Sequence, residues 1–145
     1  MRKQILALLL IVVGLVSLAY AVTKTLIIHN IGNVYTVGVE AYWDAEKTNR
    51  VTDINWGSLY PGNSSTKTLW LYNPGTANVS ITKTTNNWNP PEAQNYITLN
   101  WNPDVKTLLS GECLQVNLTL TIDTAIADTN ITDYSFDIVI SATET

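Results

Sequence analysis

Apolar and polar residues alternate strictly over several long segments of the chain, most clearly at residues 113–122. One phase of that segment is entirely apolar and consists of Leu114, Val116, Leu118, Leu120 and Ile122. Successive side chains of a β-strand point to opposite faces, so this pattern predicts a strand with one buried face. Residues 134–142 repeat the pattern, and their predicted inward phase consists of Tyr134, Phe136, Ile138 and Ile140.

Shorter segments of the same character predict further strands. They span residues 25–29, 37–43, 51–56, 66–73, 78–84 and 96–101. No segment after residue 21 keeps a period of 3.6, so we expect almost no helix in that part of the chain. About eight strands separated by regular turns are typical of an all-β fold, here a single immunoglobulin-like or jelly-roll β-sandwich.

Glycine and proline mark the expected boundaries between these strands. Pro61-Gly62-Asn63 and Asn73-Pro74-Gly75 fit type II turns, in which proline fixes φ and glycine takes the positive φ. Ile31-Gly32-Asn33 is expected to separate the first two strands. Residues 86–91 are expected to form a longer loop, because the two prolines at its end cannot donate to a sheet.

The first 21 residues have the pattern of a secretory signal peptide. Two basic residues precede an uncharged apolar run that ends at Ala19-Tyr20-Ala21, with small residues where signal peptidase cuts. The run of about 15 residues is short of the roughly 20 that span a bilayer. We therefore divide the chain into a cleavable signal, residues 1–21, and a sandwich domain, residues 22–145, that is secreted or held at the cell surface. The alternative is an uncleaved segment that anchors the domain in a membrane.

The charge of the predicted mature chain argues against nucleic acid as a partner. All 12 acidic residues but only six of the eight basic residues follow residue 21, which gives a net charge of −6. Without a basic stripe the chain lacks the electrostatic attraction to phosphate on which nucleic-acid binding depends. Membrane contact is expected only through the N-terminal segment, if it is not cleaved.

Side chains that carry chemistry are few, and we expect neither catalysis nor a cofactor or metal site. His29 and Cys113 are the only histidine and cysteine, whereas a zinc site needs three or four nitrogen or sulfur ligands. We interpret His29 as a strand residue at a sheet edge. Cys113 falls in the outward phase of its strand, either as a free thiol or as one half of an intermolecular disulfide.

Two other polar groups have open interpretations. Asp123, Asp128 and Asp133 lie close together in sequence and form either a solvated acidic loop or a source of calcium ligands. Four Asn-x-Ser/Thr sequons are candidate glycosylation sites, although Asn, Ser and Thr are common enough here for sequons to arise by chance. Their asparagines are Asn63, Asn78, Asn117 and Asn130.

Aromatic residues are the strongest indication of a binding surface. Trp70 and Tyr72 fall in the outward phase of their strand, and Trp88 falls in the predicted loop at 86–91. Exposed aromatic rings mark interfaces or platforms on which sugar rings stack. The alternative is that loops cover these rings.

Residues 54–75 carry a resemblance to a known group of exported proteins. The segment reads Ile-Asn-Trp-Gly-Ser-Leu-Tyr-Pro-Gly-Asn-Ser-Ser-Thr from residue 54, and Leu-Trp-Leu-Tyr-Asn-Pro-Gly from residue 69. It resembles short exported archaeal β-sandwich proteins of the TasA-like biofilm fibre and archaeal bundling pilus type. That resemblance implies a secreted sandwich whose copies polymerise by donor-strand exchange, in which the N-terminal strand of one subunit completes the sheet of the next.

Residues 22–31 are the candidate donor strand, with Gly32-Asn33 behind them as a hinge or tight turn. The residues expected to fill the neighbour's sheet are Leu26, Ile27, Ile28 and Ile31. The same segment can instead be the first strand of its own domain. The leading hypothesis is a structural fibre or pilus subunit that associates with itself or with other cell-surface proteins. The alternative is a carbohydrate-binding or adhesive module that takes a polysaccharide.

We expect the mature protein to begin at Val22. Intact-mass measurement of protein purified from the exporting cell checks this. A mass that still includes residues 1–21 would mean that the segment is kept as a membrane anchor.

Overall fold

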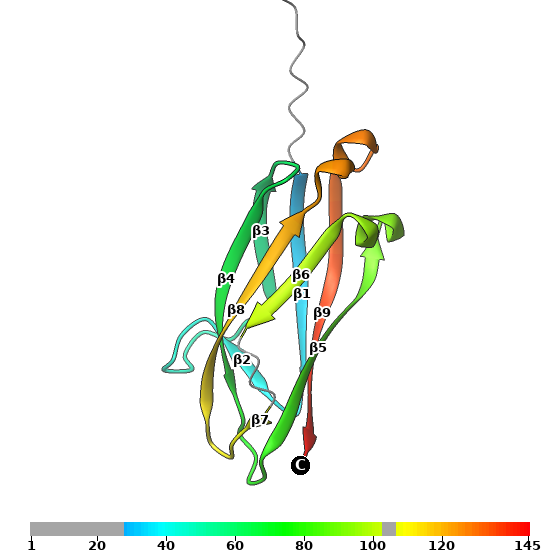
Figure 1. Cartoon of the computed structure of the whole chain (residues 1–145). Coiled ribbons are helices and arrows are strands. Elements are labelled where there is room, and N and C mark those ends of the chain that lie inside the picture. The colour runs from blue at the N-terminus through cyan, green and yellow to red at the C-terminus, as the bar shows by residue number, and fades with distance from the viewer. Residues whose placement is uncertain (1–27, 103–106) are drawn as a thin grey trace, which may run out of the picture.

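The computed structural model describes residues 28–102 and 107–145. These residues form two packed β-sheets, which confirms the predicted all-β sandwich (Figure 1). The predicted signal peptide, residues 1–21, lies outside the described residues, as do Leu26 and Ile27 of the candidate donor strand.

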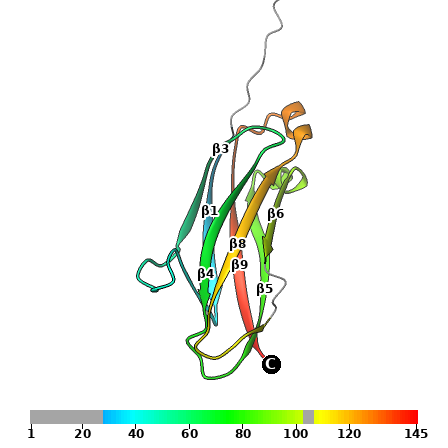
Figure 2. The same ribbon diagram turned by 60° about the vertical axis from the view of Figure 1, so that its left-hand side comes forward.

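The first sheet has the strand order β3-β1-β9-β5-β7 and the second has the order β2-β4-β8-β6. The strands of the first sheet are β1 (Ile28–Val37), β3 (Asp53–Leu59), β5 (Val79–Asn89), β7 (Thr107–Leu108) and β9 (Asp133–Glu144). Those of the second are β2 (Glu40–Tyr42), β4 (Ser64–Tyr72), β6 (Ile97–Asn102) and β8 (Cys113–Ile122). Two short 3₁₀ helices, η1 (Pro91–Asn95) and η2 (Thr124–Asp128), precede β6 and β9. The turned view shows an elongated sandwich whose long strands run along its length (Figure 2).

The core lies between the sheets and follows the predicted alternation. In β8 the buried residues are Val116, Leu118, Leu120 and Ile122, and in β9 they are Tyr134, Phe136, Ile138 and Ile140. The residues between them are more exposed, because they point to the outer faces. The period-two pattern therefore identified the buried face of both strands correctly.

The predicted turn at Ile31-Gly32-Asn33 is wrong, because Gly32 and Asn33 lie within a strand. A single strand, β1, runs through them and ends at Val37. The chain then bends at Gly38, whose φ is +74°. Gly32 lies close to the Trp56 indole instead: a Cβ placed there would lie 3.4 Å from Nε1 of Trp56, in van der Waals contact.

β1 lies inside the first sheet, with a neighbour on each side (Figure 1). It pairs with β3 in antiparallel register, from Ile28–Leu59 to Asn33–Asp53. It pairs with β9 in parallel register, from His29–Asp133 to Val37–Ser141. The first and last described strands of the domain therefore run side by side.

The predicted loop at residues 86–91 is also wrong over most of its length. β5 continues to Asn89, with an irregular register against β9 between Asn86 and Asn89. Such a bulge lets a strand bend without leaving the sheet. Trp88 therefore belongs to a strand.

Of the two predicted type II turns, one is confirmed in its key feature. Gly62 has a φ of +83°, as the Pro61-Gly62 turn requires. Gly75 has no positive φ, and its loop is held by the buried Asn73 side chain instead. The Asn73 amide accepts a hydrogen bond from the Gly75 N–H and donates to the carbonyl oxygens of Ala77, Leu108 and Leu109.

The facing of β8 and β9 can be tested by truncating single side chains. Leu118→Ala and Ile138→Ala should each lower the free energy of unfolding by about 2–5 kcal/mol, because both side chains are fully buried. Thr119→Ala should cost far less, because Thr119 lies on the outer face and loses one hydrogen bond to Thr66. Urea titration of the variants measures the differences, and equal losses at positions 118 and 119 would contradict the facing.

Candidate functional site

The place that β1 fills between β3 and β9, called the β1 slot below, is the best-defined site among the described residues. Four residues of β1 alternate toward the interior, namely Ile28, Asn30, Gly32 and Val34. The walls of the slot come from β3 and β9. Their inward side chains at this level are Ile54, Trp56, Tyr134, Phe136 and Ile138.

One end of the β1 slot is polar although it is buried. Asn30 and Tyr134 are each 4% exposed and Trp56 is 3% exposed. Both polar atoms of the Asn30 amide, Nε1 of Trp56 and the hydroxyl of Tyr134 have no hydrogen-bond partner among the described residues. Burial raises the pKa of Tyr134, and the nearby Asn30 side chain opposes this only in part, so the phenol stays neutral.

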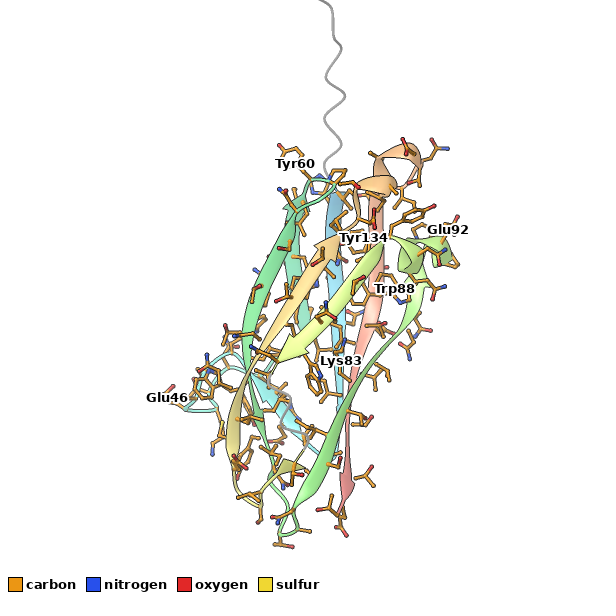
Figure 3. The ribbon with its side chains drawn as sticks, in the orientation of Figure 1. Glu46, Tyr60, Lys83, Trp88, Glu92 and Tyr134 are labelled. Carbon is orange, nitrogen blue, oxygen red and sulfur yellow. The ribbon has the colours of Figure 1, made fainter. Side chains whose placement is uncertain are left out.

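Trp88 covers the same end of the β1 slot, and the prediction that it is an exposed loop aromatic is wrong. Its ring stacks on Phe136 with centroids 4.1 Å apart. It also stacks on Tyr134 with centroids 6.5 Å apart, and Figure 3 labels these two residues close together. The Asn-rich composition around Trp88 indicated a loop, but stacking against β9 keeps this segment in the sheet.

The described part of the candidate donor segment is only partly suited to anchoring. Ile28 is fully buried and faces the core. Ile31 is 56% exposed on the outer face, so its assignment as an anchor is wrong. It borders a shallow cavity of about 350 Å³ on the first sheet, whose lining also includes His29, Asn89, Pro90 and Asp133.

Trp70 and Tyr72 lie on the outer face of the second sheet, as predicted, and both are half-buried. Trp70 is paired with Tyr42 of β2, and the Lys47 ammonium lies 3.9 Å from the centre of the Tyr72 ring. Uncharged polar residues continue this face along the sheet. They are Ser64, Thr66, Thr68, Thr98, Asn100, Asn102, Asn117, Thr119 and Thr121.

The four candidate glycosylation sites fall in two kinds of environment. Asn63, Asn78 and Asn130 are exposed in connections between strands. Asn117 is half-buried in the middle of β8, and its side-chain oxygen accepts a hydrogen bond from Thr68 at 2.8 Å.

His29 and Cys113 show no arrangement that would activate them. His29 is exposed on a central strand, which corrects its predicted place at a sheet edge, and its Nδ1 lies 2.8 Å from Oγ of Ser58. Cys113 is a half-buried free thiol, and burial raises its pKa, which disfavours the reactive thiolate.

The acidic residues near η2 have a structural role. The Asp123 carboxylate accepts a hydrogen bond from the Ala125 N–H and so caps this helix. Within residues 28–102 and 107–145, no three His, Cys, Asp or Glu side chains come together in a way that could hold a metal ion. The calcium alternative for Asp123, Asp128 and Asp133 therefore gains no support.

Sequence reasoning missed two inward polar residues. The sequence shows Asn30 as a single polar residue in an apolar strand. The only indication that it faces inward is its even spacing from the inward residues Ile28 and Val34. Lys83 also lies in the inward phase, on β5, and its ammonium donates to the carbonyl of Leu99 across the edge of the sandwich. Burial lowers the pKa of Lys83.

No protein-family model matches this chain, and a search of curated proteins finds no significant match. None of the helices in the described residues is long and apolar enough to cross a membrane.

Proposed function

We propose that this protein is a non-catalytic structural subunit of an extracellular fibre or pilus, and that it joins neighbouring copies by donating β1. The observation that supports this best is the position of β1. It is the first described strand, yet it lies between β3 and β9 and is hydrogen-bonded to both.

A terminal strand in this position can be exchanged without rethreading the chain. If β1 leaves, β3 and β9 each have an unpaired edge facing the β1 slot, which is costly for the sheet. The β1 of a second copy restores the same hydrogen bonds and the same side-chain contacts. Exchange between copies therefore preserves the interactions of the fold, and concentration decides between the two arrangements.

The exchanged unit differs from the segment suggested by the sequence. Because Gly32 and Asn33 are paired within β1, the donated strand includes all of β1, and the hinge lies at Gly38. Gly38 is suited to this bend because its φ of +74° is one that glycine adopts without strain. One copy gives its strand and receives another, so the contact is heterologous and extends into a filament unless a ring closes.

Cysteine cross-linking can distinguish a strand kept in the same chain from a donated strand. His29 on β1 and Ser58 on β3 are exposed, and their side chains lie 2.8 Å apart. His29→Cys with Ser58→Cys, in a Cys113→Ser background, should form a disulfide in either case. Donation should give a ladder of covalently linked multimers on a non-reducing gel, prepared from native assemblies of the full chain.

The matched control uses a pair that does not involve β1. The variant Thr66→Cys with Thr119→Cys places cysteines on β4 and β8, where the hydroxyl oxygens of Thr66 and Thr119 lie 2.9 Å apart. This pair should give only an internal disulfide. If the β1 pair also gives only internally linked monomer at high protein concentration, at several pH values and after heating and cooling, the fibre proposal fails.

The aromatic face of the second sheet supports a second candidate function, the binding of a polysaccharide. Tyr42, Trp70 and Tyr72 adjoin a face of hydroxyl and amide groups that can both donate and accept hydrogen bonds. A sugar ring needs this combination of an aromatic platform and uncharged polar groups. Trp88 takes no part in this surface, because it packs inside the other sheet.

Trp70→Ala should weaken binding to polysaccharide by about tenfold, which corresponds to the roughly 1.4 kcal/mol that one aromatic contact supplies. The measurement is co-sedimentation with cellulose, with chitin and with polysaccharide from the producing cells. Tyr60→Ala is the control, because Tyr60 is an exposed aromatic in the turn between β3 and β4. Equal retention of wild-type protein and of both variants would rule out this face as the site.

A further inference from the structure

The four inward positions of β1 meet different surroundings. Ile28 is fully buried, Asn30 faces the polar end of the β1 slot, and Val34 is buried at the other end. Gly32 lies between them on the same side of the strand. The slot therefore offers an ordered series of environments along its length.

The Gly32 position has room for a Cβ and for little beyond it. A Cβ there would lie 3.4 Å from Nε1 of Trp56, 3.7 Å from the carbonyl oxygen of Phe136 and 3.8 Å from Cδ1 of Ile138, which are ordinary van der Waals distances. These contacts surround the first atom of a side chain, and further atoms would crowd the indole or the core. The position therefore accepts glycine or alanine and disfavours larger residues.

The Asn30 position lies at the polar end of the slot. The backbone of Asn30 is paired with Tyr134 on one side and with Gly57, the residue after Trp56, on the other. All buried side-chain polar atoms without a partner in the described residues belong to Asn30, Trp56 and Tyr134. No hydrogen bond joins these atoms, but an amide at this position keeps a donor and an acceptor in the same buried region as the indole N–H and the phenol O–H, whereas hydrocarbon would leave both groups facing an apolar strand.

These two positions together fix the register of the strand. A slip of one residue would turn the apolar side chains to the solvent face. A slip of two residues keeps the faces but places either Asn30 or Val34 at the glycine position. In the second case it also moves Asn30 to the apolar position of Ile28. Buried polar groups are known to set register in this way.

We propose that the β1 slot is a peptide-recognition site that reads an extended strand with the inward order bulky apolar, amide, glycine, apolar, aligned parallel to β9. The matching ligand is the β1 of a second copy, because β1 of the same sequence fills the slot in the structure. This inference deepens the proposed function, because donated strands would be selected by the Asn30 and Gly32 positions. It also applies when β1 remains in its own domain.

The test measures capture of a synthetic peptide with the sequence of residues 24–37 and His29→Cys. Full mature chain carrying Ser58→Cys and Cys113→Ser is refolded with excess peptide, and the disulfide-linked product is measured by mass spectrometry. Changing Gly32→Val or Asn30→Leu in the peptide should lower capture at least tenfold. Asn33→Val, a comparable change on the outer face, should leave capture within about twofold.

Register is tested with a peptide in which the inward order of side chains is moved by two residues. The changes Asn30→Ile, Gly32→Asn, Val34→Gly and Thr36→Val place the same inward order two positions later. Such a peptide should cross-link to position 58 through a cysteine at position 31 and no longer through one at position 29. Cross-linking that stays at position 29 would overturn the inference.

Failure of the inference can be told apart from failure of the proposed function. If the wild-type peptide and the inward variants are captured equally well, strand exchange is possible but the slot does not read sequence. If no peptide is captured, the proposal of strand exchange fails. The inward order of side chains, called the code here, is then tested within one chain. There Gly32→Val should reduce the internal disulfide between positions 29 and 58 on refolding, while Asn33→Val should not, and equal yields would overturn the code.

Discussion

The hydrogen bonding of β1 on both of its edges is the constraint on which the first sheet depends. β3 and β9 are not neighbours, so only β1 connects β3 to the rest of that sheet. The cost of unpaired backbone groups makes some strand obligatory in this place. Under the proposed function, β1 of a second copy takes this place, because β1 is joined to the domain by the single bend at Gly38. Stability and assembly would then depend on the same interaction.

Two buried asparagines illustrate how polar groups in this core serve different ends. Asn73 is 1% exposed, and its amide has partners for both its oxygen and its nitrogen, so it holds one loop in a fixed shape. Asn30 is almost as deeply buried, yet its amide has no partner among the described residues. A satisfied amide rigidifies its surroundings, whereas a buried amide without a partner carries a desolvation cost.

The two proposed surfaces lie on different sheets and do not compete. β1 belongs to the first sheet, and the face with Trp70 and Tyr72 is the outside of the second. Donation of β1 would leave that outer face uncovered on every subunit. A fibre of such subunits would display the aromatic and hydroxyl-rich face repeatedly, which strengthens binding to a polymeric ligand through multivalency.

The sequence by itself determined the fold class and the inward residues of its longest strands. Period-two alternation at residues 113–122 and 134–142 is a local property, and burial of Leu118 and Ile138 follows from it. It also directed attention to the N-terminal strand and to the outward position of Trp70. These features depend only on neighbours along the chain, so a sequence pattern is sufficient to find them.

The tertiary structure alone decided where that strand ends, which aromatic residues are covered and which residues form the β1 slot. A glycine in a sequence is equally compatible with a turn and with a strand that packs closely against a large side chain. Only the folded structure, in which the Trp56 indole lies next to Gly32, distinguishes the two. Trp88 looked like a loop residue until Phe136 supplied a ring for it to stack on. The Asn33 amide donates a hydrogen bond to Asp137, 104 residues later in the chain. β1 and β9 pair over nine residues, from His29–Asp133 to Val37–Ser141. Partners so distant are brought together by burial and strand pairing, which no local pattern of residues records.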